Sequence, residues 1–285
     1  MPKVTFNNKN ALFFPSLKSA VEDYFKSNNI RKTGNWKLYL KTAILIPVAI
    51  VLYISLLFIT MPVALSITLC AVLGFVLASI GFNVMHDACH GCYSTNGRIN
   101  DTLGLTLNAL GGNAFIWKQK HNVIHHTYTN VDGVDDDIAK SPLMRQCRTQ
   151  KWVPMHRIQH IYIVLVYAIS SFAWVFIIDF VKYLSRNVYT TPLQPMKLTH
   201  HMIFWGSKVL YLAFYIALPI ALVGWKAWAI GFTVMHLIMG FTLAIVFQLA
   251  HVVEETEFEV VGVDAKVIEN EWAIHQIKTT ANFAP

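Results

Sequence analysis

Long apolar stretches alternate with polar segments along most of this chain. They cover about residues 36–60, 63–85, 161–183, 202–224 and 227–250. Each is close to the length of about 20 apolar residues that crosses a hydrocarbon core about 30 Å thick. The pattern therefore predicts an all-α, polytopic membrane protein.

The stretch 161–183 is the weakest candidate for a transmembrane helix, because it contains Asp179 and ends near Lys182. The loop that follows is positively charged, and positive loops stay in the cytoplasm. We therefore expect 161–183 to lie at the membrane interface. The favoured model has about four transmembrane helices in two hairpins, with a cytoplasmic helical cap. A five-span alternative would move His251 to the other side of the membrane.

Two shorter segments complete the expected architecture. Residues 15–27 place Leu17, Val21 and Tyr24 on one face of a helix, which indicates an amphipathic surface helix within a cytoplasmic N-terminal segment, 1–35. Residues 102–117 are apolar but short and rich in Gly and Asn, so a re-entrant or interfacial segment is expected. The membrane domain would then cover 36–285.

Composition supports this class of protein. Of the 285 residues, 55% are hydrophobic and 14% are charged, against about 25% charged in soluble domains. The net charge of +7 fits cytoplasmic loops that face anionic lipid. The basic residues are scattered and form no stripe, which argues against a nucleic-acid partner. The isolated pair Cys89 and Cys92 is weak evidence for a zinc or redox site.

Five of the twelve histidines fall in two short motifs. The first box is His86-Asp-Ala-Cys-His90, and the second is His121-Asn-Val-Ile-His125-His126. A spacing of four residues places two side chains on one face of a helix. In the second box, His126 is then expected about 100° away around the helix axis. Imidazoles that converge at a membrane surface predict a metal site.

The number of histidines indicates how many metal ions the site holds. Imidazole suits Zn, Cu, Fe and Ni, and a single zinc usually takes three or four protein ligands. The two boxes together with His251, at the end of the last apolar stretch, offer more ligands than one zinc needs. Two metal ions fit better, and a di-iron centre that activates oxygen against an apolar substrate is the predicted chemistry.

Nearby acids are candidates to orient the metal-bound histidines, since such histidines usually donate their second N–H to a carboxylate or carbonyl. These acids are Asp87, Asp135, Asp136 and Asp137. The alternative for the last three is a solvated loop. Structural or interfacial roles are expected for the remaining histidines except His275, whose role stays open. The others are His156, His160, His200, His201 and His236.

The motifs resemble those of the membrane fatty acid desaturases. The resemblance is carried by both boxes, by Ala250-His-Val-Val-Glu254, and by Gln276-Ile-Lys-Thr-Thr-Ala-Asn-Phe-Ala284. It is strongest to the bacterial acyl-lipid or linoleoyl-CoA type, related to the front-end desaturases, and it extends from about residue 30 to the end.

The resemblance implies an enzyme that inserts a cis double bond into a fatty acyl chain, carried on a phospholipid or on CoA. It further implies two iron ions, O₂, and electrons from an external ferredoxin or cytochrome. A bacterial inner membrane location, with the site facing the cytoplasm, is expected. The ligands implied by the family are His86, His90, His121, His125, His126 and His251.

Two departures from the family pattern matter. Relatives have an assisting Asn four residues before the position of His251, where this chain has Phe247, and Gln248 is a possible substitute. The family also has a third histidine box, expected beyond Pro285. On that basis the sequence is expected to be a fragment that lacks ligands and binds iron poorly.

Three other functions compete with desaturation. A related di-iron hydroxylase or alkane monooxygenase would use the same boxes. A zinc-binding membrane receptor would use the histidines for a different metal. A metal transporter would place acids or histidines midway through several helices, whereas here they gather at helix ends, which disfavours transport.

Overall fold

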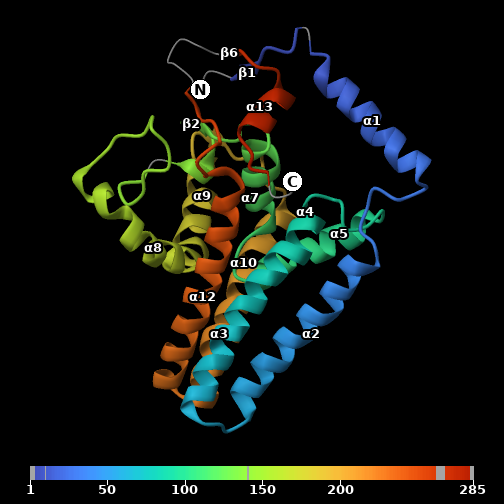
Figure 1. The fold of residues 1–285 in the computed structure, drawn as a ribbon. Coiled ribbons are helices and arrows are strands. Elements are labelled where there is room, and N and C mark those ends of the chain that lie inside the picture. Colours follow the sequence, from blue (N-terminus) through green and yellow to red (C-terminus); the bar gives the residue numbers. More distant parts are fainter. Residues whose placement is uncertain (1–3, 10, 140, 261–266, 283–285) are drawn as a thin grey trace.

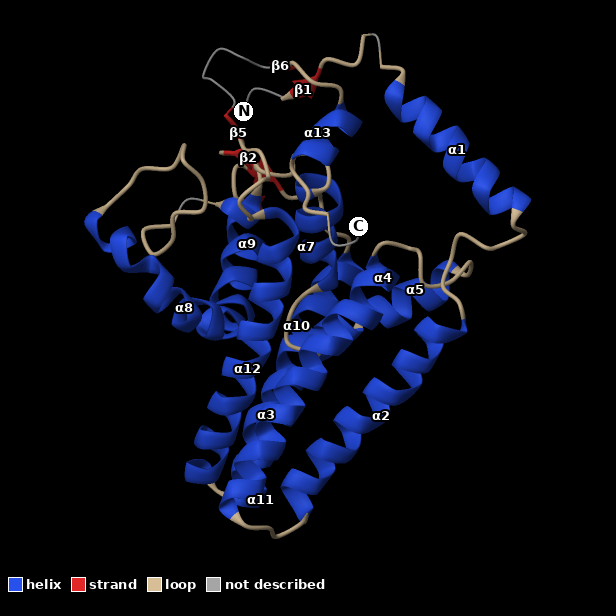
Figure 2. Cartoon of the chain, in the orientation of Figure 1, coloured by secondary structure: helices blue, strands red, loops and turns tan. Residues whose placement is uncertain are grey.

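The computed structural model describes residues 4–9, 11–139, 141–260 and 267–282, most of which are helical. Long helices run side by side, and short helices and loops gather at one end (Figures 1 and 2). Each predicted apolar stretch coincides with a helix that is long and apolar enough to cross a membrane. These helices are Trp36–Phe58, Val63–Cys89, Pro154–Ser185, Leu198–Val223 and Trp225–His251.

Several of these helices change hydrogen-bonding pattern along their length through a π-helical turn, a feature often found at functional sites. The first passes from α3 (Val63–Ile80) through η1 (Gly81–His86) to α4 (Asp87–Cys89). The next passes from α8 (Gln159–Ala173) through η5 (Trp174–Ile178) to α9 (Asp179–Ser185). The last passes from α10 (Leu198–Leu212) through η6 (Ala213–Ala217) to α11 (Leu218–Val223).

Helix α12 (Trp225–His251) packs against α3 on one side and α8 on another, while α2 (Trp36–Phe58) lies against α3. Two glycines permit these close approaches. A side chain at Gly74 would collide with the main-chain oxygen of Met235, and one at Gly240 with that of Ala168. Small residues at helix contacts are typical of membrane helices, because they let the backbones approach.

The segment 102–117, for which a re-entrant or interfacial position is expected, forms parts of three short helices. They are α5 (Gly97–Gly104), α6 (Thr106–Ala109) and α7 (Ala114–Lys118). Gly111 separates the last two with a φ of 93°, and a side chain there would collide with the Tyr211 ring. The π-helical turn η2 (Gln119–His125) continues directly from α7.

The remaining elements gather at the same end of the molecule as η2. The helices are α1 (Phe13–Ser27), which matches the predicted amphipathic helix, η3 (Asp136–Ile138), η4 (Pro154–Ile158) and α13 (Trp272–Lys278). The all-α prediction omitted three strand pairs of two residues each. They are β1 (Thr5–Phe6) with β6 (Val267–Ile268), β2 (Val131–Asp132) with β5 (Glu259–Val260), and β3 (Asn187–Val188) with β4 (Thr191–Pro192).

The segment Pro154–Ser185 contacts one loop with both of its ends. Near its start, Gln159 accepts a hydrogen bond from the main-chain N–H of Arg145 at 2.8 Å. Near its end, Lys182 Nζ lies 2.5 Å from Asp136 Oδ2. In Figure 1, α8 slants across the long helices. Both ends of the segment therefore contact residues that shortly precede it in the chain, Arg145 and Asp136.

Candidate metal centre

The first histidine box lies where α3 ends. His86 is the last residue of η1 and His90 follows α4, and their ring centroids are 4.5 Å apart. His86 Nδ1 lies 3.2 Å from Asp87 Oδ1, so the carboxylate accepts its N–H and Nε2 keeps its lone pair. The predicted common face of His86 and His90 is present in the structure.

The second box lies on η2 and the residue after it, His126, and η2 continues directly from α7. The Asn113 side chain caps α7 by accepting the Ile116 N–H at 3.0 Å. Because the turn is π-helical, the His126 N–H bonds to the His121 oxygen, five residues earlier, at 3.0 Å. The wider turn leaves His126 Nε2 3.2 Å from His121 Nε2, so the histidines of the second box lie together.

Imidazole nitrogens from both boxes converge on one point. His121 Nε2 lies 3.3 Å from His86 Nε2 and 3.2 Å from His126 Nε2. Two nitrogens bound tetrahedrally to one metal at about 2.0–2.1 Å would lie about 3.3 Å apart. The His90 ring is 4.8 Å from that of His126, and its Nε2 is buried without a hydrogen-bond partner. The donor set therefore fits a metal ion.

A second group forms around His125 and His251. Their ring centroids are 4.6 Å apart. His125 donates Nδ1–H to Asp135 Oδ2 at 3.0 Å, and its Nε2 is buried and unpartnered. His251 donates Nδ1–H to the Thr279 oxygen at 3.2 Å. These partners fix both tautomers so that each Nε2 carries a lone pair, the form that binds a metal.

The two groups meet at His121. Ligand atoms of His86, His90 and His121 lie within 4.8 Å of one another, and so do those of His121, His125 and Asp137. Asp137 Oδ2, however, lies 3.2 Å from His125 Nδ1, the nitrogen that faces away from the free Nε2. The geometry therefore favours Asp137 as a hydrogen-bond partner of His125.

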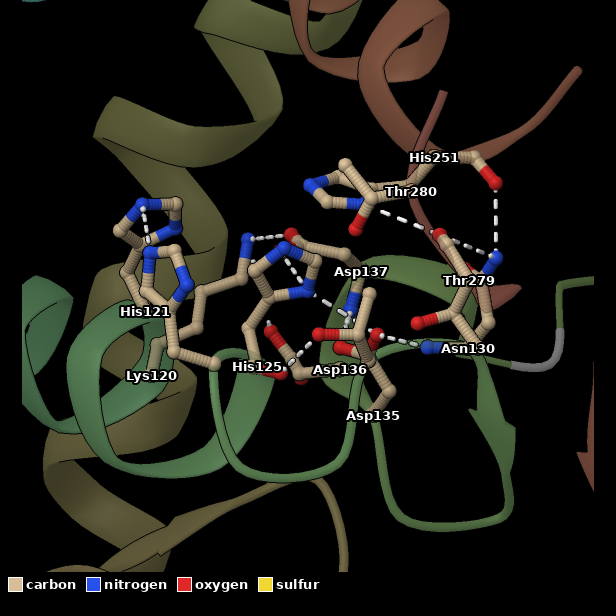
Figure 3. Close-up of polar contacts among 12 residues, drawn as sticks. Lys120, His121, His125, Asn130, Asp135, Asp136, Asp137, His251, Thr279 and Thr280 are labelled. Atoms are coloured by element: carbon tan, nitrogen blue, oxygen red, sulfur yellow. Dashed lines mark hydrogen bonds and ion pairs between the residues drawn. The ribbon is translucent and has the colours of Figure 1, made fainter. Parts of the chain in front are cut away.

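The expected orienting acids differ in what they contact, and Figure 3 shows three of them, Asp135, Asp136 and Asp137. Asp87, Asp135 and Asp137 each contact a boxed histidine. Asp136 instead contacts Lys182 at 2.5 Å and Lys120 at 3.7 Å. Gln248 accepts a hydrogen bond from Gln146 at 3.3 Å and lines a small cavity together with His125 and His251.

Burial and charge give the histidines different proton affinities. Burial, helped by His86, lowers the pKa of His90 to about 4, and burial lowers that of His126 to about 4. At neutral pH both imidazoles are therefore unprotonated, as metal binding requires. Burial opposes protonation of His125, but the carboxylates of Asp137 and Asp135 outweigh it and raise its pKa.

The other histidines are satisfied elsewhere in the described structure. His156 bonds to Val153 N and Pro142 O, His200 stacks on Phe115, and His201 bonds to Tyr183. His236 is hydrogen-bonded between helices, as predicted. His275, left open by the sequence, is buried and donates to the Thr129 oxygen at 2.8 Å. His160 is exposed.

The sequence offered no clear signal for three further residues at the site. The Trp117 ring stacks on His121 with centroids 4.3 Å apart. Thr279 orients His251 through its main-chain oxygen, and Asn130 bonds to that same oxygen. Their roles depend on tertiary contacts between distant segments, which hydropathy and motif spacing do not encode.

A small apolar cavity, of about 10 Å³, lies next to the histidines across the Phe247 side chain. Phe247 belongs to both this cavity and the polar one beside His125 and His251, and its ring centroid is 5.8 Å from that of His121. The cavity's other walls come from η1, α6, α8, η5 and α12, and include Phe82, Met85, Trp174, Met239 and Leu243. The site thus joins metal-binding chemistry to an apolar space.

Comparison with known proteins identifies the relatives of this chain. The family model for fatty acid desaturase matches residues 60–285. The sn-1 linoleoyl-lipid 6-desaturase of Synechocystis is 35% identical over 99% of this chain and 79% of its own length, and that of Arthrospira platensis is 34% identical over 99% and 76%. The acyl-lipid (8-3)-desaturase of Physcomitrium patens is 31% identical over 97% and 58%. No solved structure matches significantly.

Proposed function

The chain belongs to the fatty acid desaturase family, and we propose that it is an O₂-dependent acyl-lipid desaturase that introduces a cis double bond through a histidine-bound di-iron centre. As a member it is an oxidoreductase that acts on fatty acids, and its five long apolar helices make it an integral membrane protein. One observation carries the proposal. Two metal-capable groups share His121, His126 and His251 lie against them, and Phe247 places an apolar cavity beside His121.

Two iron ions would be held by His86, His90, His121, His125, His126 and His251. The free or convergent Nε2 atoms of these histidines support that set. Iron at this position would supply oxygen activation and the removal of two hydrogens from the acyl chain. Asp87, Asp135 and the Thr279 oxygen would keep their histidines, His86, His125 and His251, in the metal-binding tautomer. Hydrogen-bond partners of this kind typically contribute about 10–100-fold in metal affinity.

The acyl chain would lie on the apolar side of the histidines, where Phe247 and Met85 line the cavity. These two side chains would have to turn aside, because the cavity itself, of about 10 Å³, is too small for an acyl chain. The role of these side chains is to hold one C–C bond beside the metals and to exclude water. The names of the relatives support a lipid-borne substrate in preference to a CoA thioester, since the relatives reported above are lipid desaturases. A linoleoyl-type chain is the first substrate to test.

The proposed topology has four transmembrane helices and a cytoplasmic cap. Both ends of Pro154–Ser185 contact the same loop, which supports a segment that enters and leaves on one side. The proximity of His251 to His125 supports the same conclusion, because an even number of crossings places both histidines on one side of the membrane. The basic loops favour a cytoplasmic side, in a bacterial inner membrane, where a ferredoxin or cytochrome would deliver electrons.

The test is production of an unsaturated lipid in a bacterial host that lacks desaturases, with a ferredoxin and its reductase co-expressed. Lipids from cells that express the chain should contain a new cis double bond by gas chromatography and mass spectrometry. The His121→Ala variant should yield none. The purified full-length protein should contain about two iron ions. A hydroxylated product would contradict desaturation, and one zinc without iron would contradict the di-iron centre.

A further inference from the structure

Asn130 lies where three distant segments of the site meet. Its side chain is fully buried, with 0% exposure. Its φ of 57° is left-handed, a conformation that Asn tolerates better than most residues. It is neither a histidine nor an acid, so the proposed metal chemistry gives it no direct role. Its contacts nevertheless extend to both histidines of the second group.

The side chain of Asn130 reaches the segment that carries His251. Its Nδ2 lies 2.7 Å from the main-chain oxygen of His251, and 3.3 Å from those of Glu257 and Thr279 (Figure 3). The Thr279 oxygen also accepts the N–H of the His251 ring. One amide therefore holds the backbone of His251 and the carbonyl that orients its imidazole.

The main chain of Asn130 reaches His125 in the opposite direction. Its N–H donates to Asp135 Oδ2 at 3.0 Å, the same oxygen that accepts Nδ1–H of His125. Its main-chain oxygen accepts the N–H of Glu259 at 3.1 Å, beside the β2–β5 pair. Asn130 is therefore hydrogen-bonded to Asp135, the partner of the His125 imidazole, and to the backbone of His251.

We propose that Asn130 is a positioning residue that fixes His251 against His125 and so completes the second metal position. This rests on the proposed function only in that the two histidines bind a metal. The left-handed backbone turns the side chain toward the ends of α12 and α13. The amide N–H groups of Asn130 donate to the main-chain oxygens that surround them, which can only accept. An Asp at this position would present an oxygen to three carbonyl oxygens.

The decisive variant is Asn130→Gly, since Gly adopts the left-handed backbone freely and keeps the N–H that bonds to Asp135. Only the side-chain link to His251 and Thr279 is lost. The matched control is Asn29→Gly, because Asn29 also has a positive φ, of 51°, but is exposed and far along the chain from the histidines.

The first measurement is anaerobic titration of purified, metal-free protein with Fe(II). Asn130→Gly should bind one iron as the wild type does and the other about 10–100-fold more weakly. Asn29→Gly should match the wild type, and Asn130→Asp should not restore the weakened site. Equal weakening of both irons, or no weakening of either, would overturn the proposal.

A second measurement needs no metal. Amide hydrogen exchange in residues 271–280 of the metal-free protein should be faster in Asn130→Gly than in the wild type and unchanged in Asn29→Gly. Unchanged exchange in Asn130→Gly would show that the amide does not hold this segment. A full-length wild type that binds no iron would instead refute the di-iron centre, while the exchange result would still decide whether Asn130 holds the His251 side.

Discussion

His125 and His236 are both buried, with 2% and 0% exposure, yet their surroundings differ in one respect. His236 has partners at both ring nitrogens, with Ser171 Oγ at 2.9 Å from Nδ1 and the Tyr211 hydroxyl at 2.7 Å from Nε2. His125 has a partner only at Nδ1, and its Nε2 has none among the described residues.

The contrast extends to the regions around the two residues. Around His236, the side chains of α8, α10 and α12 satisfy one another's hydrogen bonds. The Phe172 ring stacks on the imidazole with centroids 4.3 Å apart. Around His125, other imidazoles bring their nitrogens toward one another. Burial alone therefore does not distinguish a ligand from a structural histidine. The distinguishing feature is a nitrogen that the protein orients but leaves without a hydrogen-bond partner.

Loss of the shared ligand should have the largest effect. In His121→Ala, both metal-binding groups lose a member, so iron content should fall toward zero and product should vanish. Elemental analysis and lipid analysis of the same preparation would measure this. Retention of two irons in this variant would show that the two groups do not share His121.

Loss of an orienting carboxylate should have a smaller effect. Asp135→Asn keeps the side-chain size but removes the charge that holds His125 in its metal-binding tautomer. Iron affinity should fall about 10–100-fold, as measured by Fe(II) titration. Asp132→Asn is the matched control, because Asp132 is buried nearby but bonds to Thr149. An equal loss in both variants would point to general disruption.

Replacement of His236 should alter stability without altering metal content. His236→Phe leaves the hydroxyls of Ser171 and Tyr211 without their partner, which should lower the free energy of unfolding by about 1–3 kcal/mol. Thermal unfolding in detergent would detect this loss. A drop in iron content at temperatures where the variant remains folded would show that His236 also contributes to metal binding.

The smallest effect is expected from a histidine pair with the spacing of the boxes but different surroundings. His156 and His160 are also four residues apart, yet His156 bonds to main-chain atoms and His160 is exposed. The double variant His156→Ala/His160→Ala should keep its iron content. A loss of iron from it would mean that spacing matters more than the free nitrogen.

The sequence was sufficient to predict the long helices, because apolar length determines where a chain can cross a membrane. It also located the two boxes, whose histidines do come together. It could not predict the π-helical turn of η2, since that depends on one extra residue accommodated within the helix by its surroundings. This turn decides where His126 lies. The lysine partners of Asp136 and the position of Asn130 were missed because they depend on contacts between distant segments.

The strand pairs around the site have a consequence for biosynthesis. β1 pairs with β6, more than 250 residues later, and β2 pairs with β5. Trp272 also donates to the main-chain oxygen of His126 at 3.2 Å. The apolar helices can enter the membrane while the ribosome is still translating, but His251 lacks its Thr279 partner until that residue has emerged. Iron loading at the His125–His251 position should therefore follow synthesis of α13, so a stalled nascent chain would be inserted in the membrane before it could hold its full complement of metal.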